Sequence, residues 1–251
     1  NSDGEWKSEI VFLNKDRVLC IGAHPDDVEL GCGGTIAKHT ALGDSVTIID
    51  LTQGELGTRG TAEVRANESK KAQKILSVKN RFNLKFADGW VENNRESQLS
   101  IISYIRQLRP KIVLCTAPND RHPDHIAASR LVIDSCFKSG LEKISTTWNE
   151  KKQRPFRPQN IYHYIQFYEI TPDFNVDISD YFLTKMKAIE AHSSQFYDPN
   201  SKEPETVISS KEFYDSISAR SSEWGRAIGV DYAEGFVAER RLGVSRITDL
   251  C

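Results

Sequence analysis

The chain has 251 residues, with 33 Lys and Arg against 35 Asp and Glu and a formal net charge of −2. This length and the 39% hydrophobic and 27% charged composition describe a folded globular protein rather than a disordered or fibrous one. The balanced charge argues against a general nucleic-acid binder, and no apolar run reaches the ~20 residues of a membrane-spanning helix. The polar start lacks the apolar segment of a secretory signal, so we expect a cytoplasmic protein.

Short apolar runs alternate with helical patterns along the first half of the chain. Three predicted strands share continuous apolar runs, as parallel strands covered on both faces do: residues 17–23, 45–51 and 111–116. Helices are predicted at 62–76, after an N-cap at Thr61, and at 99–108, ending before Pro110. The alternation predicts a doubly wound α/β fold with a mostly parallel, Rossmann-like sheet and helices on both faces.

The second half of the chain is less regular. The elements predicted there are a strand at 161–167, helices at 180–192 and 211–228, and a last strand at 235–238. No internal repeat divides the chain, so we expect one domain over residues 1–251, with the C-terminal part packed as a cap or an oligomer surface.

A His-Pro-Asp sequence occurs twice, each time just after a predicted strand. His24-Pro25-Asp26-Asp27 follows the first strand, and His122-Pro123-Asp124-His125 follows the third. Ligands bind beyond the carboxyl ends of the strands in an open parallel sheet, so both motifs project to the same edge if their strands are neighbours. Imidazole nitrogens and carboxylate oxygens are standard zinc ligands, and the repeated motif therefore predicts a metal site.

Two consecutive carboxylates, Asp26 and Asp27, can divide the work at such a site. One can bind the metal while the other acts as general base on a metal-bound water, whose pKa the metal lowers to about 7. The residues alone do not decide which of the two is the ligand. The alternative is structural, with His24 and His122 capping helices and the aspartates at helix N-termini. The duplication of the motif favours the metal site.

Glycines follow both the first motif and the second strand. Gly31, Gly33 and Gly34 stand where a dinucleotide-binding protein has G-x-G-x-x-G, but His-Pro-Asp-Asp occupies that place, which disfavours nucleotide binding. Residues 52–60 form a Gly-punctuated loop at the same edge, and this loop carries one acid, Glu55, and one base, Arg59. Arg59 can bind an anionic group of a substrate through two hydrogen bonds; the alternative is an ordinary exposed arginine.

Three segments of the sequence resemble the PIG-L/LmbE family of metal-dependent N-acetylglucosamine deacetylases: residues 23–34, 52–60 and 122–125. Four residues after the second segment resemble it too: Glu63, Arg65, Glu68 and Ala72. Residues 191–196 and 233–236 are similar to segments of the N-acetylglucosaminyl-malate deacetylases of bacillithiol biosynthesis, the subgroup that the chain resembles most. The resemblance covers most of residues 17–240.

This resemblance implies a role for each residue of the two His-Pro-Asp motifs. The implied metal ligands are His24, Asp27 and His125. Asp26 is implied as the general base, and His122 as the group that stabilises the oxyanion or protonates the leaving amine. Zn²⁺ is the implied cofactor, although Fe²⁺ and Mn²⁺ bind similar ligands.

Three further residues are candidates for contact with the substrate: Glu55, Arg59 and His192. His192 lies at the end of a predicted helix, where a C-terminal cap is the alternative. Residues 1–15 are expected to be an N-terminal extension and 143–160 a loop insert, because the family has no counterpart of either.

The implied enzyme is a zinc-dependent N-deacetylase that releases acetate from a small-molecule N-acetylglucosamine conjugate, first of all N-acetylglucosaminyl-malate. The alternatives are another amino-sugar conjugate or a chitooligosaccharide as substrate, and a non-catalytic nucleotide-binding α/β module. The resemblance also implies a homo-oligomer such as a hexamer, without a nucleic-acid or membrane partner.

Overall fold

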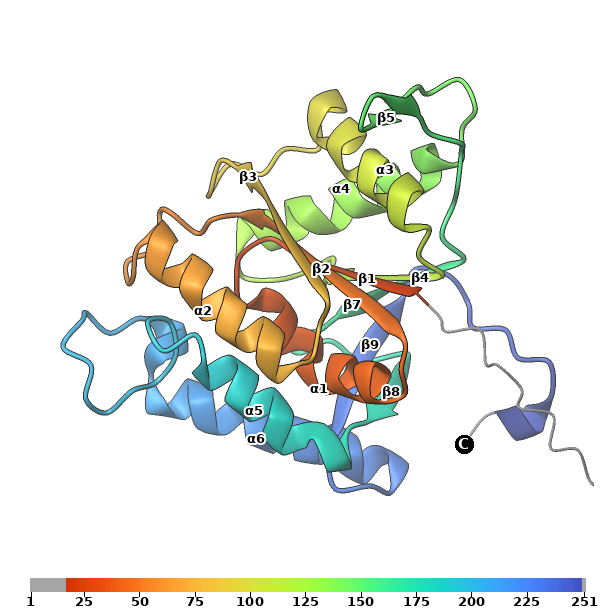
Figure 1. The fold of residues 1–251 in the computed structure, drawn as a ribbon. Coiled ribbons are helices and arrows are strands. Elements are labelled where there is room, and N and C mark those ends of the chain that lie inside the picture. The colour runs from red at the N-terminus through yellow and green to blue at the C-terminus, as the bar shows by residue number, and fades with distance from the viewer. Residues whose placement is uncertain (1–16, 250–251) are drawn as a thin grey trace, which may run out of the picture.

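The computed structural model describes residues 17–249, which form a seven-stranded sheet with helices on both faces (Figure 1). The strands of this sheet are β1 Arg17–Gly22, β2 Ser45–Thr52, β3 Asn80–Phe86, β4 Ile112–Thr116, β7 Asn160–Tyr164, β8 Phe174–Asp177 and β9 Ala233–Ala238. Their order across the sheet is β3-β2-β1-β4-β7-β9-β8. The pairs from β3 to β7 are parallel, and β9 runs antiparallel to both of its neighbours. This architecture confirms the predicted α/β fold.

The helices are α1 Asp27–Ala41, α2 Ala62–Ile75, α3 Arg95–Leu108, α4 Pro123–Ser139, α5 Phe182–Glu190 and α6 Lys211–Ile228. Helices α1, α2, α5 and α6 lie on one side of the sheet and α3 and α4 on the other (Figure 1). Short 3₁₀ helices span Ser179–Tyr181, Val207–Ser209 and Ile247–Asp249. Within residues 17–249, no helix combines the length and apolarity that a membrane crossing requires.

The two faces of strand β1 explain why apolar residues in it are continuous and do not alternate with polar ones. Val18 and Cys20 pack in the cluster beneath α1 and α2, whereas Leu19 and Ile21 pack in the cluster beneath α3 and α4. Because successive side chains of a strand point to opposite faces, a strand that is covered on both sides needs apolar residues at every position.

Several element boundaries differ from the prediction. Strand β3 was not predicted, because polar residues alternate with apolar ones in it and only Phe82, Leu84 and Phe86 pack against the core. Strand β8, also unpredicted, has four residues at the other edge of the sheet. The predicted helix 180–192 is a 3₁₀ turn followed by α5, which ends before His192. The 143–160 segment contains a hairpin of β5 Thr147–Trp148 and β6 Lys151–Lys152.

The connection of the strands brings the two His-Pro-Asp motifs together. β1 pairs with β2 on one side and with β4 on the other, so the order of the strands reverses between β1 and β4. Such a switch point opens a crevice at the carboxyl ends of the two strands. The first motif follows β1 and the second follows β4, and both therefore face this crevice.

Helix α1 is broken at Cys32, whose φ of −146° and ψ of 24° are not helical. Lys185 Nζ donates to the Leu30 carbonyl at 2.8 Å, and the Glu234 carboxylate accepts from the backbone N–H groups of Gly34 and Thr35 at 2.9 and 2.7 Å. In a regular helix the Gly34 N–H would donate to the Leu30 carbonyl. The buried Lys185–Glu234 pair, 2.6 Å apart, takes the place of that bond and ties α1 to α5 and β9.

Candidate active site

Side chains from both motifs converge at the carboxyl ends of β1 and β4. His24 Nδ1 lies 3.3 Å from His125 Nε2. The Asp27 carboxylate lies beside both rings, with Oδ1 3.1 Å from His125 Nε2 and Oδ2 3.5 Å from His24 Nδ1. All three side chains are buried, and the two ring nitrogens and the two carboxylate oxygens thus lie around one small volume.

Carboxylates on the far sides of the two imidazoles fix their tautomers. His24 Nε2 lies 3.0 Å from Asp88 Oδ1 and 3.3 Å from Asp124 Oδ2, and His125 Nδ1 lies 3.0 Å from Asp120 Oδ1. A carboxylate is an acceptor, so each ring carries its proton on the side of that carboxylate. The lone pairs of His24 Nδ1 and His125 Nε2 are then directed at each other and toward Asp27, as in the carboxylate–histidine–metal arrangement.

The spacing of these atoms fits a divalent metal. Ligands ~2.0–2.1 Å from a tetrahedral zinc ion are ~3.3–3.4 Å apart, close to the 3.3 Å between His24 Nδ1 and His125 Nε2. The Asp27 carboxylate places one oxygen near each of these nitrogens, at 3.1 and 3.5 Å. Two imidazoles and one carboxylate with a remaining open position are the ligand set of a catalytic rather than a structural zinc site.

Two combinations of described residues without Asp27 also bring potential ligand atoms within 4.8 Å of one another: His24, His122 and His125, and His24, Asp88 and Asp124. In the second group the carboxylates already accept backbone hydrogen bonds. Asp88 Oδ2 accepts from Leu56 N at 2.8 Å, and Asp124 accepts from the N–H groups of Gly89 and Val91 at 2.7 and 3.2 Å. These bonds direct both carboxylates to the outer side of His24, where they orient the ring.

Asp88 and Asp120 were not among the predicted site residues. Asp88 follows β3, which was not predicted, although the alternation of Phe82, Leu84 and Phe86 with polar residues was a usable signal for a half-buried strand. Asp120 follows β4 in the same loop as the second motif, so its position after a predicted strand was a usable signal.

Opposite charges in the ligand cluster shift the pKa values of its members. Burial alone would raise the pKa of Asp27, but the charge and hydrogen bond of His125 and the contact with His24 hold that pKa well below its usual value. Burial alone would lower the pKa of His125, but the Asp27 charge and the hydrogen bond to Asp120 raise it to about 9. Asp27 is therefore ionised at neutral pH, whereas the His125 ring without a metal carries a proton on both nitrogens, and a metal bound at Nε2 would displace the proton there.

Asp26 lies beside this cluster in a strained conformation. Its φ of 133° and ψ of −24° are unusual for a residue with a side chain, and strain of this kind costs ~1–3 kcal/mol and clusters at functional sites. Asp26 Oδ2 accepts from Arg65 Nη2 at 3.1 Å, and Arg65 also donates to the carbonyls of Pro25 and Gly54. Burial raises the pKa of the Asp26 carboxyl, although Arg65 opposes the shift.

His122 combines a structural and a chemical role. Its Nδ1 accepts from the backbone N–H of Asp124 at 3.2 Å and caps α4, so the structural alternative holds for this contact. With Nδ1 as acceptor, the neutral ring carries its proton on Nε2. Burial, followed by the charges of His24 and His125, lowers the pKa of His122. At neutral pH this side chain is an uncharged hydrogen-bond donor.

Glu55 and Arg59 are both engaged by the protein itself. The Arg59 guanidinium is buried, with Nε 3.3 Å from the Glu203 carboxylate and Nη2 bonded to the Ser201 hydroxyl. Glu55 is exposed, and its Oε1 accepts from Asp88 N at 3.0 Å. Glu55 therefore orders the loop next to His24, and Arg59 holds residues 201–203 against the same loop.

His192, predicted to contact substrate, is instead fully buried behind the site. Its Nε2 lies 3.3 Å from Glu29 Oε1 without the alignment of a hydrogen bond. Burial would raise the pKa of Glu29, but Arg81 and His192 lower it to about 2. With no exposed surface, His192 packs against Glu29 inside the protein, and in this structure it presents nothing to a substrate.

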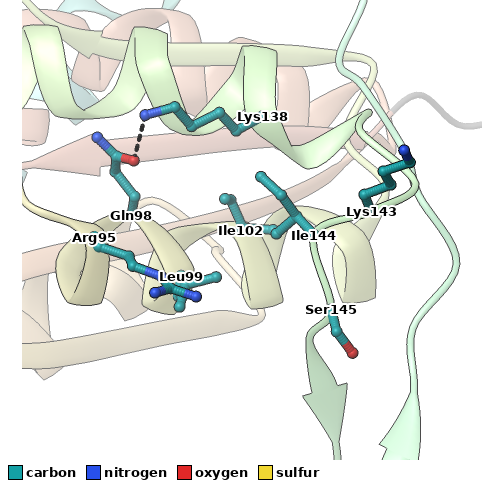
Figure 2. A pocket seen from close by; sticks show the side chains of 8 residues that line it. All are labelled: Arg95, Gln98, Leu99, Ile102, Lys138, Lys143, Ile144 and Ser145. Carbon is teal, nitrogen blue, oxygen red and sulfur yellow. Dashed lines mark hydrogen bonds between the residues drawn. The ribbon is translucent and has the colours of Figure 1, made fainter.

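A cavity of about 530 Å³ between α3 and α4 lies apart from these residues (Figure 2). It is lined by Arg95, Gln98, Leu99, Ile102, Lys138, Lys143, Ile144 and Ser145. Lys138 Nζ donates to Gln98 Oε1 at 2.6 Å across it. The lining has no carboxylate or imidazole, so the cavity supplies neither metal ligands nor a general base.

Comparison with known proteins finds a family that matches the segment containing both His-Pro-Asp motifs. The family described as GlcNAc-PI de-N-acetylase, PIG-L, matches residues 19–136. A diacetylchitobiose deacetylase of Thermococcus kodakarensis is 34% identical over 241 residues, which are 92% of this chain and 86% of that protein. A Bacillus anthracis protein described as a "probable N-acetyl-alpha-D-glucosaminyl L-malate deacetylase 2" is 27% identical over 73% of this chain and 83% of its own length.

A solved structure has the same fold over nearly the whole chain. The crystal structure of a conserved protein from Thermus thermophilus matches with a TM-score of 0.80 and 37% sequence identity. The match covers 91% of this chain and 97% of that one.

Proposed function

This chain belongs to the PIG-L family, and we propose that it removes the acetyl group from an N-acetylglucosamine-containing substrate by metal-dependent hydrolysis. The observation that carries the proposal is the cluster of His24 Nδ1, His125 Nε2 and the Asp27 carboxylate, 3.1–3.5 Å apart, with the buried Asp26 carboxyl beside it. Zn²⁺ suits this ligand set, and Fe²⁺ and Mn²⁺ suit it as well.

A divalent metal held by His24, Asp27 and His125 would polarise the acetamide carbonyl and would lower the pKa of a water so that a base can deprotonate it for attack. Asp26 is the general base of the proposal. Its Oδ2 is held by Arg65, which leaves Oδ1 to take the proton of the attacking water. Since burial raises its pKa, the same carboxyl can hold that proton and pass it to the leaving amine nitrogen.

His122 stabilises the oxyanion in this proposal. Its Nε2–H is an uncharged donor, and a proton at Nδ1 would break the cap of α4. Of the two roles left open by the sequence, oxyanion stabilisation is the one that keeps this bond. Protonation of the leaving amine then falls to Asp26.

We propose a short chitooligosaccharide such as diacetylchitobiose as the first candidate substrate. The support is the diacetylchitobiose deacetylase at 34% identity over 92% of the chain. N-acetylglucosaminyl-malate, the first expectation from sequence, becomes the second candidate, supported by the relative at 27% identity. The Arg59–Glu203 contact also weakens the malate case, because it engages the cation expected to bind malate. The cytoplasmic location and the homo-oligomer stay predictions.

A panel assay of acetate release tests the proposal. The zinc-loaded protein is incubated with diacetylchitobiose, N-acetylglucosaminyl-malate and N-acetylglucosamine. We expect acetate from all three, with the highest kcat/KM for diacetylchitobiose. Preference for the malate conjugate would reverse the order of the candidates, and no acetate from any of them would contradict a deacetylase of N-acetylglucosamine-containing substrates.

A further inference from the structure

We propose that the indole of Trp90 is a platform on which the substrate stacks the sugar ring next to the one that loses its acetyl group. This inference rests on the proposed function and names its substrate class: an uncharged glycan of at least two rings rather than a conjugate with a small anion. The ring would lie at the rim formed by Leu56 and Trp90.

Both residues of this rim are unusually exposed for their type. Trp90 is 73% exposed and Leu56 is 66% exposed. They belong to neighbouring loops, since a Cβ atom added to Gly89 would lie 3.1 Å from Leu56 Cδ1. A single exposed apolar residue needs no explanation, but two at the edge of a candidate active site indicate a surface that a ligand covers.

The backbone that carries Trp90 is held firmly. Its own N–H donates to the Ala87 carbonyl at 3.2 Å, which closes a turn with Gly89 at a φ of 76°. The residues on either side, Gly89 and Val91, both donate to the carboxylate of Asp124. The exposed indole is therefore attached to a fixed main chain. Because little conformational freedom of this main chain remains to be lost, ligand binding costs little entropy there.

The same contacts connect the rim with the reacting centre. Asp124 and Asp88 both contact His24 Nε2, at 3.3 and 3.0 Å. Leu56 N donates to the other oxygen of Asp88 at 2.8 Å. The rim is thus connected to His24, a proposed metal ligand, through a single carboxylate. It lies beside the place where the N-acetylated ring would react.

The charges at the rim favour an uncharged ring over malate. Three carboxylates belong to or contact the loops that carry Leu56 and Trp90: the exposed Glu55 and the buried Asp88 and Asp124. An anionic group would be repelled there, and the arginines of this region, Arg59 and Arg65, are bonded to Glu203 and Asp26. A pyranose ring offers an apolar C–H face to the indole and hydroxyl donors to the exposed carboxylate of Glu55.

The test compares wild type with Trp90→Ala and Trp90→Phe on diacetylchitobiose and on free N-acetylglucosamine. We expect Trp90→Ala to lower kcat/KM for the disaccharide about tenfold, mainly through KM, and to leave the monosaccharide within about twofold. Trp90→Phe should keep most of the disaccharide activity. Leu42→Ala is the control, since Leu42 is 70% exposed at the end of α1 and should change neither substrate.

Equal effects of Trp90→Ala on both sugars, or none on the disaccharide, would overturn the platform while leaving the deacetylase proposal intact. If the wild type releases no acetate, binding of diacetylchitobiose is measured by fluorescence titration. Tighter binding by wild type than by Trp90→Ala would support the stacking platform even without deacetylase activity. Equal binding by the two proteins would refute it. Light scattering completes the test, because an oligomer that dissociates on Trp90→Ala would show that the rim is a subunit interface instead.

Discussion

The consecutive carboxylates Asp26 and Asp27 have different surroundings, which fit the general base and the metal ligand that we propose. Asp27 contacts both imidazoles, whereas Asp26 has a positive φ and accepts a hydrogen bond from Arg65. Two consecutive residues of the same type thus acquire different environments from one unusual backbone angle. A sequence shows the pair of carboxylates but not this angle, and the assignment of the two roles came from family resemblance.

Replacement of Asp26 tests the division of roles. Asp26→Asn keeps the size of the side chain and an acceptor for Arg65 but removes the base. We expect kcat for diacetylchitobiose to fall by a factor of ~10²–10⁴ while the protein still binds one equivalent of metal, measured by acetate release and by metal analysis. Normal turnover by the metal-loaded variant would assign the base to another group.

A substitution at His122 can separate the capping bond accepted by Nδ1 from the proton donor at Nε2. Asn is a good N-cap residue, so His122→Asn should keep the bond to Asp124 N but lose the donor at Nε2. We expect a free energy of unfolding within ~1 kcal/mol of wild type and a kcat lower by ~10²–10³, with little change in KM. His122→Ala, the comparison variant, should lose stability as well. If His122→Asn keeps wild-type kcat, the ring has only the capping role.

At the scale of elements, the break in α1 matters most for the site. The half of α1 before the break carries Asp27, and Lys185 holds it through the Leu30 carbonyl while Glu234 caps the half after it. These two residues come from α5 and β9, far along the chain. Residues 233–236 had stood out in the sequence only by resemblance, and their contact with α1 gives that segment a physical role.

We expect removal of one charge of the Lys185–Glu234 pair to lower the free energy of unfolding more than removal of both charges. Glu234→Gln leaves the buried Lys185 ammonium without its charged partner, with the Leu30 carbonyl still as acceptor, and the loss of one charge of a buried pair costs ~3–5 kcal/mol. The double variant with Lys185→Met leaves no uncompensated charge, and we expect it to be more stable than Glu234→Gln alone. Urea unfolding at pH 7 measures both, with Lys211→Met, an exposed ion-pair residue, as control. Strictly additive losses would contradict the coupling.

Much of the fold and of the site could be predicted because they follow from strongly apolar strands. β1, β2 and β4 are covered on both faces, so their runs stand out, and their carboxyl ends locate His24, Asp27, His122 and His125. β3 is an edge strand with polar alternation, and with it Asp88 was missed. His192 shows another limit: its position after a helix is visible in the sequence, but the pairing with Glu29 depends on packing between segments that are far apart in the chain.

At the scale of the whole molecule, the site joins parts of the chain that are distant in sequence. Its proposed ligands come from the end of β1, the first turn of α1 and the first turn of α4, and carboxylates from the loops after β3 and β4 orient them. The strand order across the switch point creates this meeting place, and no single segment contains a complete site. The account therefore predicts that activity depends on a metal held by all three ligands together.

Acetate release from diacetylchitobiose before and after metal removal tests this claim most directly. We predict that the chelator-treated, metal-free protein releases no acetate above background and that about one equivalent of Zn²⁺ per chain restores activity. Asp27→Asn, treated in the same way, should not recover at that zinc concentration. A metal-free wild-type protein that still released acetate at the zinc-loaded rate would contradict the account.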